Sequence, residues 1–137
     1  MRHLILLAFV VAALTGLTSC AAKPCTEQDP AFVKSLQGLV QEWQDASTLA
    51  GSTPRASLAV QIAALQSIRR RTVDLTAPAC GKAAQTALAT AMDQGIDGFT
   101  AFLGQAPEAD VNAKFALSAS AFATATEEIG KLSVVPK

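Results

Sequence analysis

Hydrophobic residues recur at spacings of three and four over most of the chain after residue 29. In residues 30–50, for example, Phe32, Leu36, Leu39 and Trp43 follow one another in this way. This spacing places the side chains on one face of an α-helix. The same pattern predicts helices over residues 30–50, 54–75, 79–104 and 107–131. No stretch alternates with the period of two that is typical of strands, so the predicted fold class is all-α.

Short breaks separate the predicted helices, and each break contains a proline. They are Gly51-Ser52-Thr53-Pro54, Thr76-Ala77-Pro78 and Gly104-Gln105-Ala106-Pro107. Glycine often follows the end of a helix, and proline often begins one. Asp29 lies directly before Pro30 and is expected to cap the first helix. Because such short connections join antiparallel neighbours, we expect an up-down-up-down four-helix bundle over residues 30–132. An extended pair of helical hairpins is the alternative.

The N-terminal residues follow a different pattern. A short basic start is followed by an apolar run from Leu4 to Leu17 and then by small residues, which is the layout of a secretory signal peptide. The apolar run is too short for the ~20 residues of a membrane-spanning helix. The tetrapeptide Leu17-Thr18-Ser19-Cys20 resembles the lipobox of bacterial lipoproteins. The resemblance implies cleavage before Cys20 and a lipid on its sulfur; a secreted protein with a chance cysteine near its cleavage site is the alternative.

This resemblance implies a division of the chain and a location. Residues 1–19 are the removed signal peptide, 20–29 the lipidated cysteine and a tether, 30–132 the bundle and 133–137 a tail. The lipid makes the membrane a partner and places the protein in the bacterial cell envelope. Ala21 follows the cysteine, in place of the Asp that resembles an inner-membrane retention signal in some bacteria. The outer membrane is therefore expected where two membranes are present.

The composition argues against catalysis and against nucleic-acid binding. The formal net charge is +0, and the chain has no tyrosine and one histidine. That histidine, His3, leaves with the signal peptide, so the mature chain has no Ser-His-Asp or Cys-His arrangement. The carboxylate pairs Glu42 with Asp45 and Asp93 with Asp97 lie away from the apolar faces, so we interpret them as solvated helix surface. We expect a protein that is not an enzyme, with no metal and no cofactor.

Two cysteines remain after Cys20 is assigned to the lipid. Cys25 and Cys80 form an even pair in a chain that is expected to be exported, which predicts a disulfide. Two free thiols or a metal site are the alternatives, but two thiols without a histidine make a poor metal site. Cys25 and Cys80 sit at the starts of the first and third predicted helices, which begin at the same end of an up-down bundle. The disulfide and the bundle topology therefore support each other.

The densest charged run is Arg69-Arg70-Arg71, near the end of the second predicted helix. In the structural interpretation, Arg70 pairs with Asp74 one turn later, and Arg69 and Arg71 reach acids on neighbouring helices. In the functional interpretation, the three arginines contact a phosphate, lipid headgroups or a protein partner.

Gly95 lies within the apolar face of the third predicted helix, where glycine costs about 1 kcal/mol relative to alanine. Close approach of a neighbouring helix, against Phe115 or Phe122, is one explanation. An apolar pocket formed by Gly95, Phe99, Phe115 and Phe122 is the other. Trp43 is interpreted as a core anchor.

We expect the whole protein to act by binding. Its first expected role is a helical interaction or scaffold module that contacts another envelope protein. A carrier of a small apolar ligand or lipid in the bundle core is the alternative.

Overall fold

The computed structural model describes residues 25–132, which fold into helices. In chain order the elements are α1 (Cys25–Gln28), α2 (Pro30–Ser52), the 3-10 turn η1 (Arg55–Ser57), α3 (Leu58–Asp74), the 3-10 turn η2 (Ala79–Gly81), α4 (Lys82–Leu103) and α5 (Glu108–Lys131). No strand occurs in this part of the chain, and the all-α prediction is confirmed. The predicted signal peptide, Cys20 and the tail 133–137 lie outside the described residues. None of the described helices is both long and apolar enough to cross a membrane.

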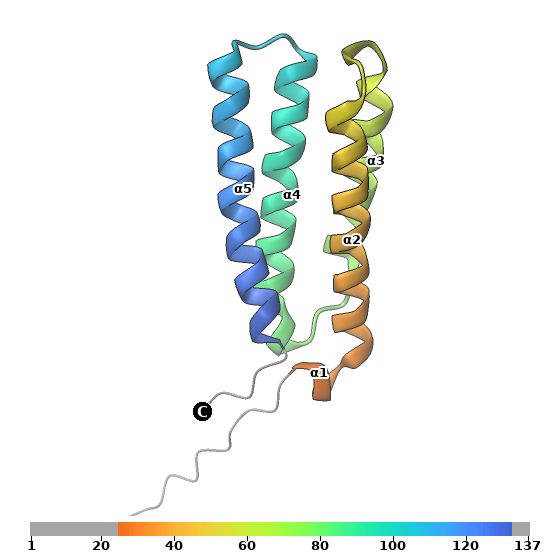
Figure 1. Cartoon of the computed structure of the whole chain (residues 1–137). Helices are drawn as coiled ribbons and strands as arrows, with labels where there is room; N and C mark the ends of the chain where they lie inside the picture. Colours follow the sequence, from red (N-terminus) through yellow and green to blue (C-terminus); the bar gives the residue numbers. More distant parts are fainter. Residues whose placement is uncertain (1–24, 133–137) are drawn as a thin grey trace, which may run out of the picture.

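The four long helices lie side by side, and consecutive helices are connected at alternate ends of the structure (Figure 1). α2 packs against α3, α3 against α4, and α4 against α5, and the last of these contacts is the most extensive. The single turn of α1 lies at the end where α2 begins and α5 ends. There the backbone amide of Thr26 donates a hydrogen bond to the carbonyl of Leu132 over 3.1 Å. The first described turn is thus tied to the end of the last helix.

The predicted helices differ from the observed ones mainly at their starts. Pro54 and Pro78 are extended, and each is followed by a 3-10 turn before α-helical hydrogen bonding begins. The amides of Ser57 and Gly81 close these turns, each on a proline carbonyl 2.9 Å away. Residues 25–28, expected as part of a tether, form α1 instead. The hydrogen bond to the end of α5 and the disulfide described below hold this turn in place.

The helix ends combine an expected cap with an unexpected one. The Asp29 side chain accepts a hydrogen bond from the Phe32 amide over 2.9 Å, which confirms the predicted cap. At the other end of the molecule, α4 ends at Leu103, but Gly104 keeps a negative φ of −74°. Gln105 has the positive φ of 58° instead. The reversal of the chain into α5 therefore falls one residue after the glycine that marked it in the sequence.

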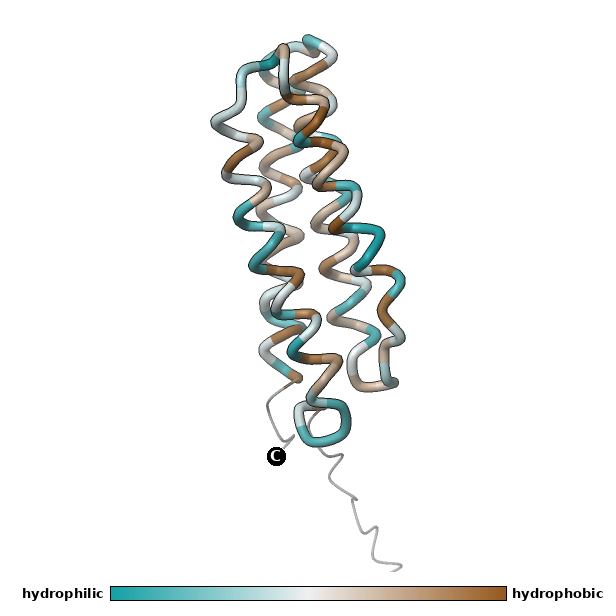
Figure 2. Tube along the Cα trace, turned by 90° about the vertical axis from the view of Figure 1, so that its right-hand side faces the viewer, coloured by the Kyte–Doolittle hydropathy of each residue, from teal (hydrophilic) through white to brown (hydrophobic). Residues whose placement is uncertain are grey.

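The core is built from aliphatic and aromatic side chains of α2, α3 and α4, with fewer contributions from α5. Figure 2 shows hydrophobic positions recurring among hydrophilic ones along the long helices, as the spacing of three and four predicts. The largest fully buried side chains are Leu36, Leu58, Leu65, Leu88, Met92, Thr72 and Cys25. The hydroxyl of Thr72 donates to the Ile68 carbonyl over 3.1 Å, so its burial leaves no polar group unpaired.

The disulfide between Cys25 and Cys80 joins α1 to η2, with the two Cα atoms 5.6 Å apart. This separation is within the usual range for a disulfide. Cys25 is 2% exposed, and its side chain is part of the hydrophobic core. The predicted disulfide is confirmed, and it fastens the start of α2 to the start of α4.

Candidate functional site

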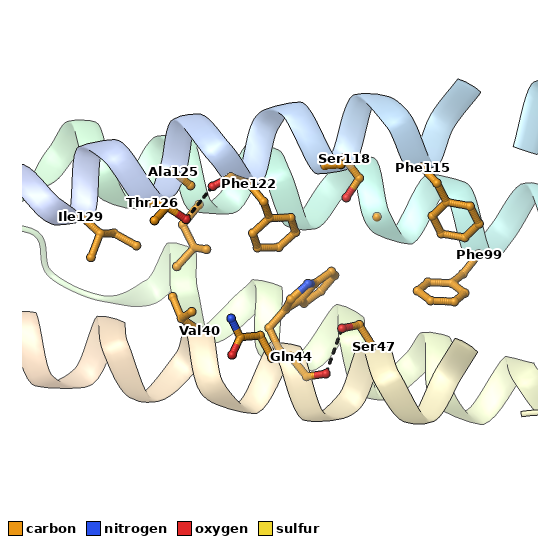
Figure 3. A pocket seen from close by; sticks show the side chains of 14 residues that line it. Val40, Gln44, Ser47, Phe99, Phe115, Ser118, Phe122, Ala125, Thr126 and Ile129 are labelled. Carbon is orange, nitrogen blue, oxygen red and sulfur yellow. Dashed lines mark hydrogen bonds between the residues drawn. The ribbon is translucent and has the colours of Figure 1, made fainter. Parts of the chain in front are cut away.

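An apolar cavity of about 370 Å³ lies between α2, α4 and α5 (Figure 3). From α2 it is lined by Val40, Trp43, Gln44 and Ser47, and from α4 by Leu88, Gly95 and Phe99. The α5 residues that line it are Phe115, Ser118, Ala119, Phe122, Ala125, Thr126 and Ile129. These α5 positions repeat at spacings of one, three and four, so they form one continuous face of the helix.

The cavity exists because α2 and α5, the first and last long helices, do not pack closely against each other. α2 packs mainly against α3, and α5 packs against α4. Large side chains partly bridge the gap, since the ring centroids of Trp43 and Phe122 lie 5.8 Å apart. The small residues Gly95, Ala119 and Ala125 leave the remaining space open.

All four residues of the pocket suggested by the sequence line this cavity. Gly95 and Phe99 reach it from α4, and Phe115 and Phe122 reach it from α5. The rings of Phe99 and Phe115 meet edge to face with centroids 5.1 Å apart. Trp43 is 3% exposed, as expected of a core anchor, and it also lines the cavity.

Other lining residues were missed, above all those of α2. Val40, Gln44 and Ser47 belong to the side of α2 that faces α5. Helical periodicity shows that a face is buried, but it does not show which neighbouring helix the face meets. Nothing in the pattern therefore singled these residues out.

The polar groups of the lining are mostly satisfied within their own helices. The hydroxyl of Thr126 donates to the Phe122 carbonyl over 2.8 Å, and that of Ser47 to the Gln44 carbonyl over 3.1 Å, as the dashed lines in Figure 3 show. Ser118 donates to the Ala91 carbonyl over 3.3 Å. The side-chain amide of Gln44 has no hydrogen-bond partner within residues 25–132. No charged side chain lines the cavity.

The glycines of α4 allow close packing, although not with the partners expected for Gly95. A Cβ atom at Gly95 would lie 2.9 Å from Cζ2 of Trp43. The expectation that Gly95 meets Phe115 or Phe122 is therefore wrong, because the tryptophan of α2 occupies that space. Gly98 is the glycine that meets a phenylalanine of α5, since a Cβ atom there would lie 2.7 Å from Cε1 of Phe115.

Replacing Gly98 with alanine lowers the free energy of unfolding by about 1 kcal/mol. Overpacking costs about 1–3 kcal/mol, and the better helix propensity of alanine returns about 1 kcal/mol. Gly38→Ala in α2 is the matched control, because nothing lies within 4 Å of its added Cβ. That control raises the free energy of unfolding by about 1 kcal/mol. Urea unfolding of both variants measures the difference, and an equal gain in both would contradict the close packing of Gly98.

The arginines of α3 point toward different neighbours and do not converge on one site. Arg69 Nη2 lies 2.8 Å from Oδ2 of Asp93 on α4. Arg71 forms a two-point ion pair with Glu42 on α2. The hydrogen bond from Arg71 holds the pKa of the Glu42 carboxyl below its usual value. The ion pairs with acids on neighbouring helices agree with the structural interpretation of Arg69 and Arg71.

Arg70 differs from its two neighbours. It is exposed and makes no ion pair in the described part of the chain. The expected pair with Asp74 is wrong; an arginine placed before an acid at this helical spacing is the less favourable order. Within the cluster, only Arg70 is free to contact an external anion. The acids Glu42 and Asp93, interpreted as solvated surface, are each held in an ion pair.

Comparison of the chain with protein-family models, with curated proteins and with solved structures gives no match.

Proposed function

We propose that this chain is a bacterial envelope lipoprotein, anchored by lipid on Cys20, whose helices bind a small apolar ligand between α2, α4 and α5. The cavity carries the proposal. Its volume of about 370 Å³ falls in the range of small-molecule sites, about 300–1,000 Å³. Its uncharged, mainly apolar lining suits an apolar molecule. On this ground we place the carrier role ahead of the scaffold role that the sequence favoured.

We also propose that the helices form an up-down-up-down four-helix bundle. The packing of each long helix against the next along the chain supports this class. The disulfide supports it too, because it joins the two chain positions that would start at the same end.

An interaction role remains the second candidate. Val60 on α3 is 71% exposed and Leu49 on α2 is 54% exposed. Single exposed aliphatic side chains are common on protein surfaces, so this candidate ranks below the carrier role.

Changing Cys20→Ser releases the protein from membranes or leaves it unprocessed. The reason is that the lipidated cysteine is the only anchor implied by Leu17-Thr18-Ser19-Cys20. Membrane fractionation and the mass of the mature chain measure the effect. Ser19→Ala is the control and keeps a small residue before the cysteine. If Cys20→Ser fractionates and migrates like the unchanged chain, the lipid anchor is disproved.

Trp43 provides a direct test of the cavity. It is the only tryptophan in a chain without tyrosine, and it lines the cavity. Its emission therefore responds to a molecule that enters. We expect native mass spectrometry to detect a copurified ligand, and a brominated apolar probe to quench the emission. If the purified protein carries no ligand and no apolar probe quenches the Trp43 emission, the carrier function is disproved.

A further inference from the structure

The cavity is elongated along α5. On α5 its lining runs from Phe115 to Ile129, which is about 21 Å at about 1.5 Å per residue. On α4 the lining runs from Leu88 to Phe99, which is about 17 Å, and on α2 from Val40 to Ser47, which is about 11 Å. The space between the three helices is therefore elongated along the helix axes.

The chemistry of the lining fits a hydrocarbon chain and not a polar headgroup. The hydroxyls of Ser47, Ser118 and Thr126 are already bonded to backbone carbonyls. No charged side chain is present to bind an ionised head. Gln44 and Ala119 line the cavity and are also exposed, so the cavity opens to water along the gap between α2 and α5. A polar head can stay in water there while the tail is buried.

We propose that the ligand is a single extended hydrocarbon chain, the tail of a linear amphiphile such as a fatty acid, which lies along α5 between Phe115 and Ile129. This inference rests on the proposed carrier function and names the class of its ligand. Carbon–carbon bonds of about 1.5 Å advance an extended chain by about 1.3 Å per carbon. The lining on α5, about 21 Å long, then corresponds to about 16 carbons.

The test measures affinity against chain length. It uses residues 21–137, which keep every described helix, the disulfide and the whole buried core. Brominated hexadecanoic acid quenches Trp43, and unbranched octanoic, dodecanoic, hexadecanoic and eicosanoic acids compete with it. Each added methylene tightens binding about twofold to fourfold. The gain levels off near about 16 carbons, where the lining ends. Hexadecanol binds within about threefold of hexadecanoic acid, because the lining holds no charge for the head.

Two outcomes separate this inference from the function on which it rests. If compact adamantanol competes as well as hexadecanoic acid, or if chain length has no effect, the ligand is apolar but not a linear chain. The inference is then overturned and the carrier function stands. If no probe of either shape affects Trp43, both are overturned.

A matched pair of variants places the chain in the cavity. Ala119→Phe adds a ring at the exposed edge of the lining and weakens binding of hexadecanoic acid at least about tenfold. Ala113→Phe adds the same ring to an exposed position of α5 that does not line the cavity, about 120° around the helix. It leaves the affinity within about twofold. Circular dichroism checks that both variants are folded, and equal affinities in the two would overturn the placement.

The lipid on Cys20 is a competing occupant, because the cysteine lies five residues before Cys25. Lipidated protein in vesicles is compared with residues 21–137 mixed with the same vesicles. If the ligand is a separate amphiphile, the lipidated protein and residues 21–137 bind the brominated acid equally. Loss of binding in the lipidated protein alone would show that its own acyl chain fills the cavity, and would overturn the proposal.

Discussion

Replacing both Cys25 and Cys80 with serine lowers the free energy of unfolding by about 4 kcal/mol. The bond spans 55 residues of sequence, and the loop-closure entropy that it removes from the unfolded chain amounts to about 4 kcal/mol for a loop of this size. The effect is large for a domain whose total stability is about 5–15 kcal/mol. Urea unfolding followed by Trp43 emission measures it.

The single variants and a reductant provide the controls. Cys25→Ser and Cys80→Ser each remove the same bond, so each loses about as much stability as the double variant. Reductant destabilises the unchanged chain and leaves the double variant unaffected. Equal urea midpoints for the oxidised and the reduced chain would show that the bond does not form or contributes nothing.

Replacing Leu65 with alanine lowers the free energy of unfolding by about 3–5 kcal/mol. Leu65 is 0% exposed and lies in the core cluster on α3. Its truncation loses the transfer free energy of the removed methyl groups and leaves a cavity that the surrounding helices fill only in part. Thermal or urea unfolding gives the change.

Leu117→Ala is the matched control for this variant. It makes the same chemical change on α5, at a side chain that is 59% exposed. Its effect stays within about 0.5 kcal/mol. A loss of similar size at both positions would contradict the assignment of Leu65 to the core.

The long helices could be predicted because each has an apolar face of regular period and a proline at or near its start. The Cys25–Cys80 bond could be predicted because two cysteines remained in a chain that was expected to be exported. The turns η1 and η2 could not, because the choice between 3-10 and α-helical bonding after Pro54 or Pro78 depends on packing that the local residues do not specify.

The candidate site was predictable in part for a similar reason. Gly95 stood out because glycine is costly in the middle of an apolar helical face. The partners of that face were not readable from the sequence. Trp43, rather than a phenylalanine of α5, occupies the space beside Gly95. The acids that pair with Arg69 and Arg71 lie on two different helices, and one-dimensional periodicity cannot rank such choices.

The disulfide also separates the helices that are synthesised first from those that follow. The loop that it closes contains α2 and α3 and excludes α4 and α5. In a chain that crosses a membrane N-terminus first, both cysteines emerge before most of α4 has followed. The bond can therefore close around the α2–α3 hairpin while the second hairpin is still in transit. One wall of the apolar cavity is then held in place before the α4 and α5 walls arrive to complete it.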